Sequence, residues 1–147
     1  MSNLRYSESV VIGRTPDELY DMVADVTRMG EWSPICTACW WDDGDGPRTG
    51  AWFTGRNELP ERTWETRSQV VAAEPGREFA FVVGGAWVRW GYTFAPVAGG
   101  TEVTEYYELE ENLPLKLYWA LFGKARGRTN ARNMETTLER IKAVAEG

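Results

Sequence analysis

The chain has 147 residues, 43% of them hydrophobic and 26% charged, a composition typical of one globular domain. Its net charge of −6 argues against nucleic acid as a partner, and it contains no histidine, the commonest general base and a frequent metal ligand. No apolar run approaches the ~20 residues of a membrane span, and the N-terminus lacks a hydrophobic signal region, so we expect a cytoplasmic protein.

The first predicted elements are a strand and two short helices. Residues 4–12 alternate as a strand does, with one face formed by Leu4, Tyr6, Val10 and Ile12. Thr15 and Pro16 then mark a helix start, since threonine caps helices, proline suits the first position and Glu18 completes a capping box. A second short helix is predicted over residues 25–32, ending before Ser33-Pro34.

Two cysteines, Cys36 and Cys39, follow with C-x-x-C spacing. A redox pair would place the first cysteine at a helix N-terminus, but Pro34 before it and Trp40-Trp41 after it indicate the start of a strand. A structural zinc site needs four ligands, and the chain supplies neither a second cysteine pair nor a histidine. We therefore expect two small buried thiols and no metal.

From Ala51 onward the sequence predicts a meander of strands, because short turns recur at Pro60-Glu61, Pro75-Gly76, Gly84-Gly85 and Gly99-Gly100. These turns fix the register if each is centred on the two residues named. The predicted opposite pairs are Asn57 with Trp64, Val70 with Phe81, Phe81 with Val88, Phe79 with Trp90, Tyr92 with Tyr107 and Phe94 with Glu105.

Cross-strand partners share a face. The four turns therefore divide the side chains of five consecutive strands between the same two faces of the sheet. One face is almost entirely apolar or aromatic; the other is charged, with Arg56, Glu58, Glu65, Arg67, Arg89, Glu102 and Glu108. Six of the eight tryptophans lie between Trp40 and Trp90, which adds to the aromatic content of this sheet.

A final helix is predicted from about Thr129, with an apolar stripe of Met134, Leu138, Ile141 and Ala145. Before it, residues 113–128 combine leucine and aromatic side chains with Lys124, Arg126 and Arg128. Such a segment suits transient contact with a membrane interface, or a helix start that seals a cavity mouth. Residues 112–147 carry 7 basic and 3 acidic side chains, a basic segment on an acidic chain, which suits either pairing with the acidic part of the protein or attraction to anionic surfaces.

Six polar residues lie on the predicted apolar face: Asn57, Thr66, Ser68, Tyr92, Glu105 and Tyr107. A buried polar group without a partner costs about 1–3 kcal/mol, so these side chains require each other, water or a ligand. Glu105 is the most informative of them, because burial among aromatic rings favours its neutral, proton-donating form. An arginine, water or an exposed strand edge would satisfy it equally.

The aromatic face either fills itself or encloses a cavity, and the thin stripe of one helix favours a cavity. An apolar cavity with a few polar groups describes a small-molecule site. The candidate ligand-binding residues are Phe53, Asn57, Trp64, Thr66, Ser68, Phe79, Phe81, Trp90, Tyr92, Phe94, Val103, Glu105, Tyr107, Met134 and Leu138.

The order of strand, two helices, meander and C-terminal helix resembles the helix-grip fold of the START/polyketide cyclase-dehydrase (SRPBCC) superfamily, in its single-domain bacterial form. The residues that carry the resemblance are Thr15-Pro16-Asp17-Glu18-Leu19-Tyr20, Ala24-Asp25-Val26, Glu31-Trp32-Ser33-Pro34, Gly50-Ala51-Trp52-Phe53, Arg56-Asn57, Arg89-Trp90-Gly91-Tyr92-Thr93-Phe94, Gly99-Gly100-Thr101-Glu102-Val103-Thr104 and Thr137-Leu138-Glu139-Arg140-Ile141-Lys142. The resemblance spans the whole chain, as one α+β domain over residues 1–147, with a curved seven-stranded antiparallel sheet around the C-terminal helix.

The resemblance implies a hydrophobic cavity and lipids, polyketides, sterols or aromatic natural products as ligand classes. It does not identify catalytic residues, because a shared fold does not imply a shared reaction. We expect binding or carriage of an apolar or aromatic small molecule, without a cofactor. The first alternative is a cyclase, aromatase or dehydratase in which Glu105 exchanges protons while Tyr107 and Asn57 polarise a carbonyl. The second is a stress or toxin-type regulatory protein. Oligomeric state is left open.

Overall fold

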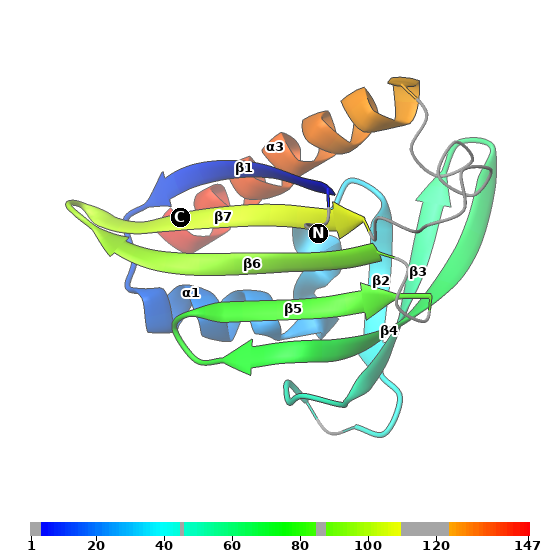
Figure 1. The fold of residues 1–147 in the computed structure, drawn as a ribbon, viewed down its shortest axis with the longest axis horizontal. Coiled ribbons are helices and arrows are strands. Elements are labelled where there is room, and N and C mark those ends of the chain that lie inside the picture. Colours follow the sequence, from blue (N-terminus) through cyan, green and yellow to red (C-terminus); the bar gives the residue numbers. More distant parts are fainter. Residues whose placement is uncertain (1–3, 45, 85–87, 110–123) are drawn as a thin grey trace.

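The computed structural model describes residues 4–44, 46–84, 88–109 and 124–147, of which residues 4 and 124–128 are described by their backbone alone. Seven strands form one antiparallel sheet in the order β1-β7-β6-β5-β4-β3-β2 (Figure 1). They are β1 (Leu4–Ile12), β2 (Cys36–Trp41), β3 (Trp52–Leu59), β4 (Arg62–Glu74), β5 (Glu78–Val83), β6 (Val88–Val97) and β7 (Gly100–Leu109).

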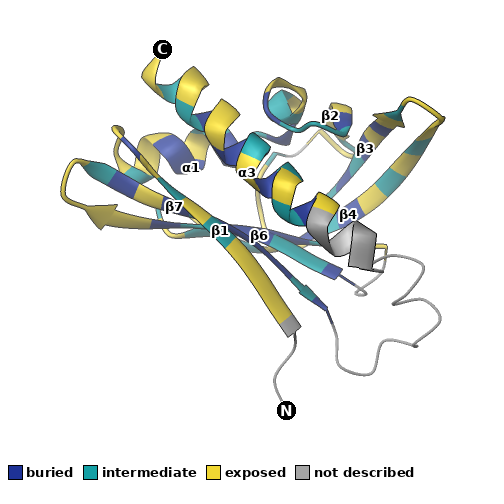
Figure 2. Ribbon diagram, turned by 90° about the horizontal axis from the view of Figure 1, so that it is seen from above, coloured by how far each residue is buried: buried dark blue, intermediate teal, exposed yellow. Residues whose placement is uncertain are grey.

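The helical elements are α1 (Pro16–Ala24), the 3-10 helix η1 (Val26–Glu31) and α3 (Lys124–Glu146). Figure 2 shows α1 and α3 on the same side of the sheet, with the sheet folded around them. The predicted seven-stranded α+β helix-grip architecture, with two short helices after the first strand, is confirmed. No helix in the described part of the chain is long and apolar enough to cross a membrane.

Helix α1 begins as its sequence predicts. The Thr15 hydroxyl oxygen accepts a hydrogen bond from the Glu18 backbone N–H at 3.2 Å, and Pro16 occupies the first turn. The buried face of α1 presents Tyr20 to the sheet, where its ring meets Phe79 and Phe94 edge-on, with centroids 6.4 and 6.0 Å apart. Side chains therefore fill the space between α1 and the sheet.

The C-terminal end of α3 is fastened to the end of β1 and the residues after it. The Glu146 carboxylate accepts from the Gly13 N–H at 2.8 Å, Arg14 donates to the Ala145 carbonyl at 2.7 Å, and Lys142 donates to the Val11 carbonyl at 2.8 Å. The predicted apolar stripe lies underneath, with Leu138 and Ile141 buried. These contacts hold one end of α3 against the sheet.

The predicted division of the sheet into an apolar and a charged face is confirmed, but two of the four predicted registers are wrong. Asn57 pairs with Trp64 and Val70 with Phe81, as expected. In the β5–β6 and β6–β7 hairpins each partner is displaced by two residues, so that the observed pairs are Phe81 with Trp90, Phe79 with Tyr92, Tyr92 with Glu105 and Phe94 with Val103. The β6–β7 turn is centred on Ala98-Gly99, because Val97 pairs with Gly100.

Tyr106 interrupts the simple alternation, because it lies on the outer face and is only 1% exposed. Its register partner on β6 is Gly91, and a Cβ atom there would lie 2.5 Å from the Tyr106 ring carbon Cζ and from its hydroxyl oxygen. The glycine therefore leaves the space in which the tyrosine ring lies flat across the sheet.

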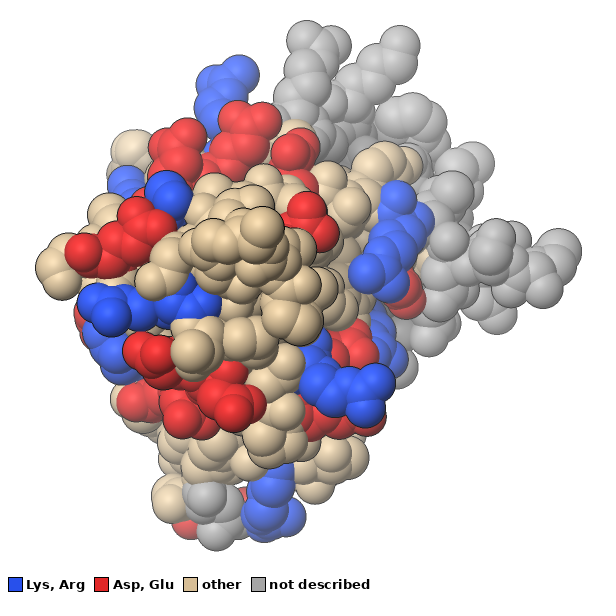
Figure 3. Space-filling view, turned by 90° about the vertical axis from the view of Figure 1, so that its left-hand side faces the viewer, with Lys and Arg blue, Asp and Glu red and all other residues tan. Residues whose placement is uncertain are grey.

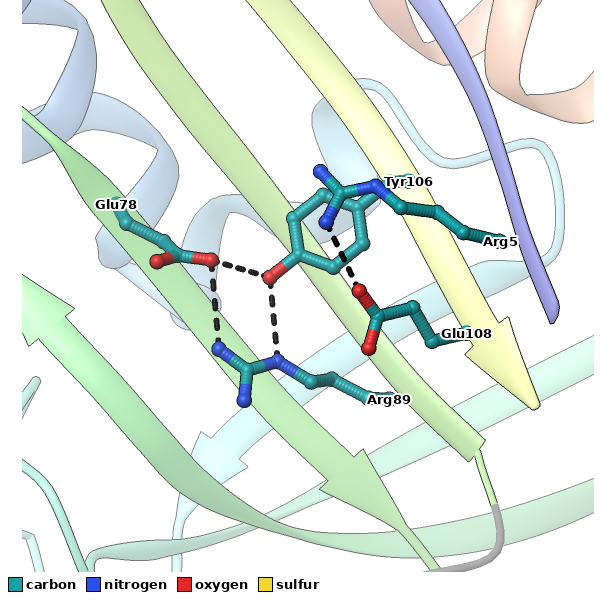
Figure 4. A network of polar contacts seen from close by, with 5 residues as sticks. All are labelled: Arg5, Glu78, Arg89, Tyr106 and Glu108. Atoms are coloured by element: carbon teal, nitrogen blue, oxygen red, sulfur yellow. Dashed lines mark hydrogen bonds and ion pairs between the residues drawn. The ribbon is translucent and has the colours of Figure 1, made fainter. Parts of the chain in front are cut away.

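Charged side chains from four strands surround this ring (Figure 4). The Tyr106 hydroxyl donates to Glu78 and accepts from Arg89 at 3.2 Å. The Arg5 guanidinium lies 3.8 Å from the ring centroid and pairs with Glu108 at 2.8 Å. Burial, and then the hydrogen bond to Glu78, raise the pKa of Tyr106 to about 12, so the phenol stays protonated. The network joins β1, β5, β6 and β7 on the convex side.

Acidic and basic side chains are interspersed around an uncharged patch on the face shown in Figure 3. This face shows no extended basic surface of the kind that binds nucleic acid.

Candidate functional site

A cavity of about 440 Å³ lies between the inner face of the sheet and α3. The strands β3 to β7 provide its floor, α3 contributes Asn130, Asn133, Met134 and Thr137, and η1 with the following segment closes another side through Met29 and residues 33–36. The volume falls within the range of pockets that hold organic small molecules.

Nine of the fifteen predicted site residues line this cavity. They are Phe53, Asn57, Trp64, Thr66, Phe81, Trp90, Tyr92, Glu105 and Met134. They come from five strands and one helix, and the alternation of the strands brings them to one face. Their contact with a ligand stays a prediction.

The other six predicted residues lie on the inner face or on α3 but are not part of the cavity lining: Ser68, Phe79, Phe94, Val103, Tyr107 and Leu138. Phe79 and Phe94 pack under Tyr20 of α1, and Val103 and Leu138 belong to the same solid core. Tyr107 stacks on Tyr6, with ring centroids 5.1 Å apart, and contacts Trp90 at 4.8 Å. The inner face is thus filled at one end and hollow at the other.

Sequence reasoning missed Gly55, Val83 and Val88 on the sheet, Gly84 directly after β5, and two further parts of the lining. The first comprises Met29, Ser33, Pro34, Ile35, Cys36 and Cys39, which approach the cavity because η1 and β2 fold over its edge. The second comprises Asn130, Asn133 and Thr137 of α3. Helical spacing from Met134 could have identified this second group, because Asn130 and Thr137 lie four and three residues from it.

Glu105 is the most deeply buried carboxyl group at the site, being 6% exposed. The Tyr92 hydroxyl donates a hydrogen bond to its Oε2 atom at 3.1 Å. Its Oε1 atom is buried and has no hydrogen-bond partner among the described residues. Because buried oxygens are nearly always paired, this one calls for a partner from outside the described residues, such as a bound ligand.

Burial raises the pKa of Glu105 to about 8, although the hydrogen bond from Tyr92 opposes the shift. Burial also raises the pKa of Tyr92 well above its usual value, and the neighbouring Glu105 adds to this. At neutral pH the pair is therefore largely uncharged, and Glu105 carries a proton that it can donate to an acceptor in the cavity.

The polar groups on the opposite side of the cavity are amides and hydroxyls. The Asn57 side-chain nitrogen donates to the Thr66 hydroxyl oxygen at 3.2 Å, which links β3 to β4. Among the described residues, no cluster of three or more His, Cys, Asp or Glu side chains is placed to hold a metal ion. The lining offers hydrogen bonds and apolar contact to a guest.

The segment 113–128, considered above for membrane contact or closure of the cavity, lies outside the described residues apart from the backbone of 124–128. Both interpretations stay predictions.

Fold and cavity together define a class: single-layer sheets wrapped around a C-terminal helix, with an internal pocket between the two. Residues 3–146 match the family described as polyketide cyclase/dehydrase and lipid transport. The chain belongs to this family, which confirms the resemblance seen in the sequence. No protein with curated annotation matches significantly.

Solved structures agree with this assignment. A Polyketide_cyc-like protein from Corynebacterium glutamicum, known from its solution NMR structure, is 40% identical, with 99% of this chain and 93% of that one covered and a TM-score of 0.67. The two-domain ARO/CYC protein StfQ of the steffimycin biosynthetic pathway is 16% identical, covers 98% of this chain over 51% of its own length, and has a TM-score of 0.76. A crystal structure from Chromobacterium violaceum is 15% identical over 99% of both chains, with a TM-score of 0.73. The last two similarities show the fold.

Proposed function

We propose that residues 1–147 form one ligand-binding domain that binds or carries an apolar or aromatic small molecule, such as a lipid or a polyketide, in this cavity. The observation that supports the proposal most directly is a space of about 440 Å³ whose walls are largely apolar and whose floor holds the Glu105 oxygen that lacks a partner among the described residues. Apolar walls give affinity, and one buried polar group orients a guest. The family description, polyketide cyclase/dehydrase and lipid transport, is consistent with such a ligand.

Filling the cavity tests this proposal. Thr66 on β4 lines the cavity, so Thr66→Phe should occupy part of the space and weaken binding of the apolar dye Nile red. We expect a loss of at least about tenfold in affinity, which corresponds to about 1.4 kcal/mol. The measurement is a fluorescence titration of the dye into each protein.

The matched control is Glu65→Phe, which adds the same ring on the exposed, opposite face of β4. It should bind Nile red as the unmodified protein does. If the two variants bind equally well, or if the unmodified protein takes up no dye, the cavity is not the binding site.

A second candidate function is a cyclase or dehydratase, and the protonated Glu105 favours it, because a buried acid can protonate a carbonyl as a bond forms. Tyr107, named with Glu105 in the sequence-based hypothesis, does not line the cavity, whereas Tyr92 hydrogen-bonds to the acid. The expected result is that Glu105→Gln abolishes cyclisation of a poly-β-carbonyl substrate while binding persists. Unchanged turnover would remove Glu105 from the reaction.

A further inference from the structure

Two cysteines face the cavity because β2 contains a bulge. Residues three apart on a regular strand point to opposite faces, which would direct only one of Cys36 and Cys39 inward. The register with β3 shifts between Cys36 and Ala38, so that Cys36 pairs with Asn57 and Cys39 with Gly55. Both side chains are consequently buried and both line the cavity. Bulges are often found where a strand must redirect a functional side chain.

The two sulfur atoms lie against the same glycine. A Cβ atom on Gly55 would be 3.3 Å from the Cys36 sulfur and 3.5 Å from the Cys39 sulfur. The thiols are free, and the Cys36 thiol donates to the Ala38 carbonyl at 3.3 Å. The absence of a side chain at Gly55 therefore makes room for a pair of thiols in the cavity wall.

The pair is asymmetric in its acid–base behaviour. A hydrogen bond between the two thiols lowers the pKa of Cys36, against the opposing effect of burial. The same contact, followed by burial, raises the pKa of Cys39. The thiolate is the nucleophilic form, so this direction favours Cys36 as the reactive member, and Cys39, which lies against the same glycine, is placed to donate a hydrogen bond to it.

An acid lines the same cavity as the two thiols. Tyr92 lines the cavity together with Cys36, and its hydroxyl donates a hydrogen bond to Glu105. The cavity thus presents a nucleophile, a phenol and a buried carboxylic acid to one guest. A carbonyl oxygen held by Glu105 would lie in the same apolar space as the Cys36 sulfur.

We propose that Cys36 adds covalently to an apolar α,β-unsaturated carbonyl compound held in the cavity. The inference rests on the proposed binding function and specifies the chemical class of one guest. The sulfur bonds to the β-carbon, the C=C electron pair moves to the α-carbon and carbonyl, and the proton that leaves the thiol ends on the α-carbon. The net change adds S–H across the double bond and requires neither oxidant nor reductant.

The test uses chalcone, an apolar aromatic enone, and its saturated analogue dihydrochalcone, which can bind but cannot react. Intact-mass spectrometry of the folded full chain should show a single chalcone adduct, and peptide mapping should place it on Cys36. Cys36→Ser should form no adduct, whereas Cys39→Ala should form it several-fold more slowly because the hydrogen-bond donor is lost. Circular dichroism and a thermal melt show that each variant is folded.

Three outcomes overturn the proposal. One is an adduct on Cys39, or equal rates for the unmodified protein and Cys39→Ala. The second is that dihydrochalcone quenches the tryptophan emission of the protein, which shows binding, while chalcone forms no adduct. That result leaves the binding function intact. The third is a Cys36–Cys39 disulfide, recognised when neither thiol reacts with a maleimide in denaturant until a reductant is added. If neither chalcone nor dihydrochalcone binds, the broader binding function fails for this ligand class too.

Discussion

Replacing Glu105 by glutamine is expected to stabilise the protein at pH 8 and to remove most of the pH dependence of its stability between pH 5 and 8. The buried carboxyl has a pKa of about 8 in the fold, whereas an unfolded chain ionises it near 4.3. Between these values the folded state holds a proton that the unfolded state has lost. The free energy of unfolding therefore falls as pH rises, by about 1.4 kcal/mol per pH unit from this group.

The sign of this effect distinguishes Glu105 from carboxylates in ion pairs, which stabilise a fold as pH rises. The contribution of Glu105 is fully present below the unfolded pKa and is lost as pH passes the folded one. Glutamine has the same shape, still offers an oxygen to Tyr92 and never ionises, so the difference between the two proteins should grow with pH until about 8.

Urea denaturation at intervals from pH 5 to 9 measures this difference. Glu8→Gln is the matched control, because Glu8 is the register partner of Glu105 on β1 and is only half-buried. That variant should retain the slope, since Glu105 is still present. Parallel pH profiles for the unmodified protein and Glu105→Gln would show that Glu105 is not buried as described.

Gly91→Ala is the second substitution with a large expected effect. The new methyl group would lie 2.5 Å from the Tyr106 ring, so the ring must leave its place across β6. That movement disrupts its hydrogen bonds with Glu78 and Arg89 and its contact with Arg5. We expect a loss of about 2–4 kcal/mol in unfolding free energy, from overpacking and from polar groups left without partners.

A double-mutant cycle separates this mechanism from the ordinary effect of alanine in a strand. In a Tyr106→Val background the space above residue 91 is open, so Gly91→Ala should be nearly neutral there. The two substitutions should therefore be strongly non-additive in urea denaturation. Additive effects would mean that the methyl group and the tyrosine ring do not compete for the same space.

The alternation of the strands was enough to predict which face of the sheet is buried, even where the register was wrong. When the centre of a turn moves by one residue, each residue is paired with a partner two positions further along the opposite strand. Because side chains alternate with a period of two, each side chain stays on the same face of the sheet. Tyr92 was therefore placed correctly on the inner face although it was paired with Tyr107 instead of Glu105. What the error changed was position along the strand, which decides whether a residue meets the cavity or the solid core.

Other features depend on three-dimensional context that no local pattern encodes. The bulge in β2 turns one cysteine side chain of the pair to the face opposite the one expected from regular alternation. No feature of the sequence Cys36-Thr37-Ala38-Cys39 predicts this bulge. Tyr106 looks like an exposed residue by alternation and is buried because a glycine on the adjacent strand makes room. The aromatic surroundings of Glu105 left both burial and an exposed strand edge open, and its pairing with Tyr92 required the correct register.

The fastening of α3 at its C-terminal end has a mechanical consequence. Gly13, Arg14 and Lys142 hold that end to the sheet, whereas Asn130, in the cavity roof, lies 11 residues before Ile141, or roughly 16 Å along the helix axis. A small tilt about the fastened end displaces Asn130 far more than Ile141, as a lever moves most at its far end. We therefore expect any displacement of α3 by a ligand to be largest near Asn130 and smallest around Ile141.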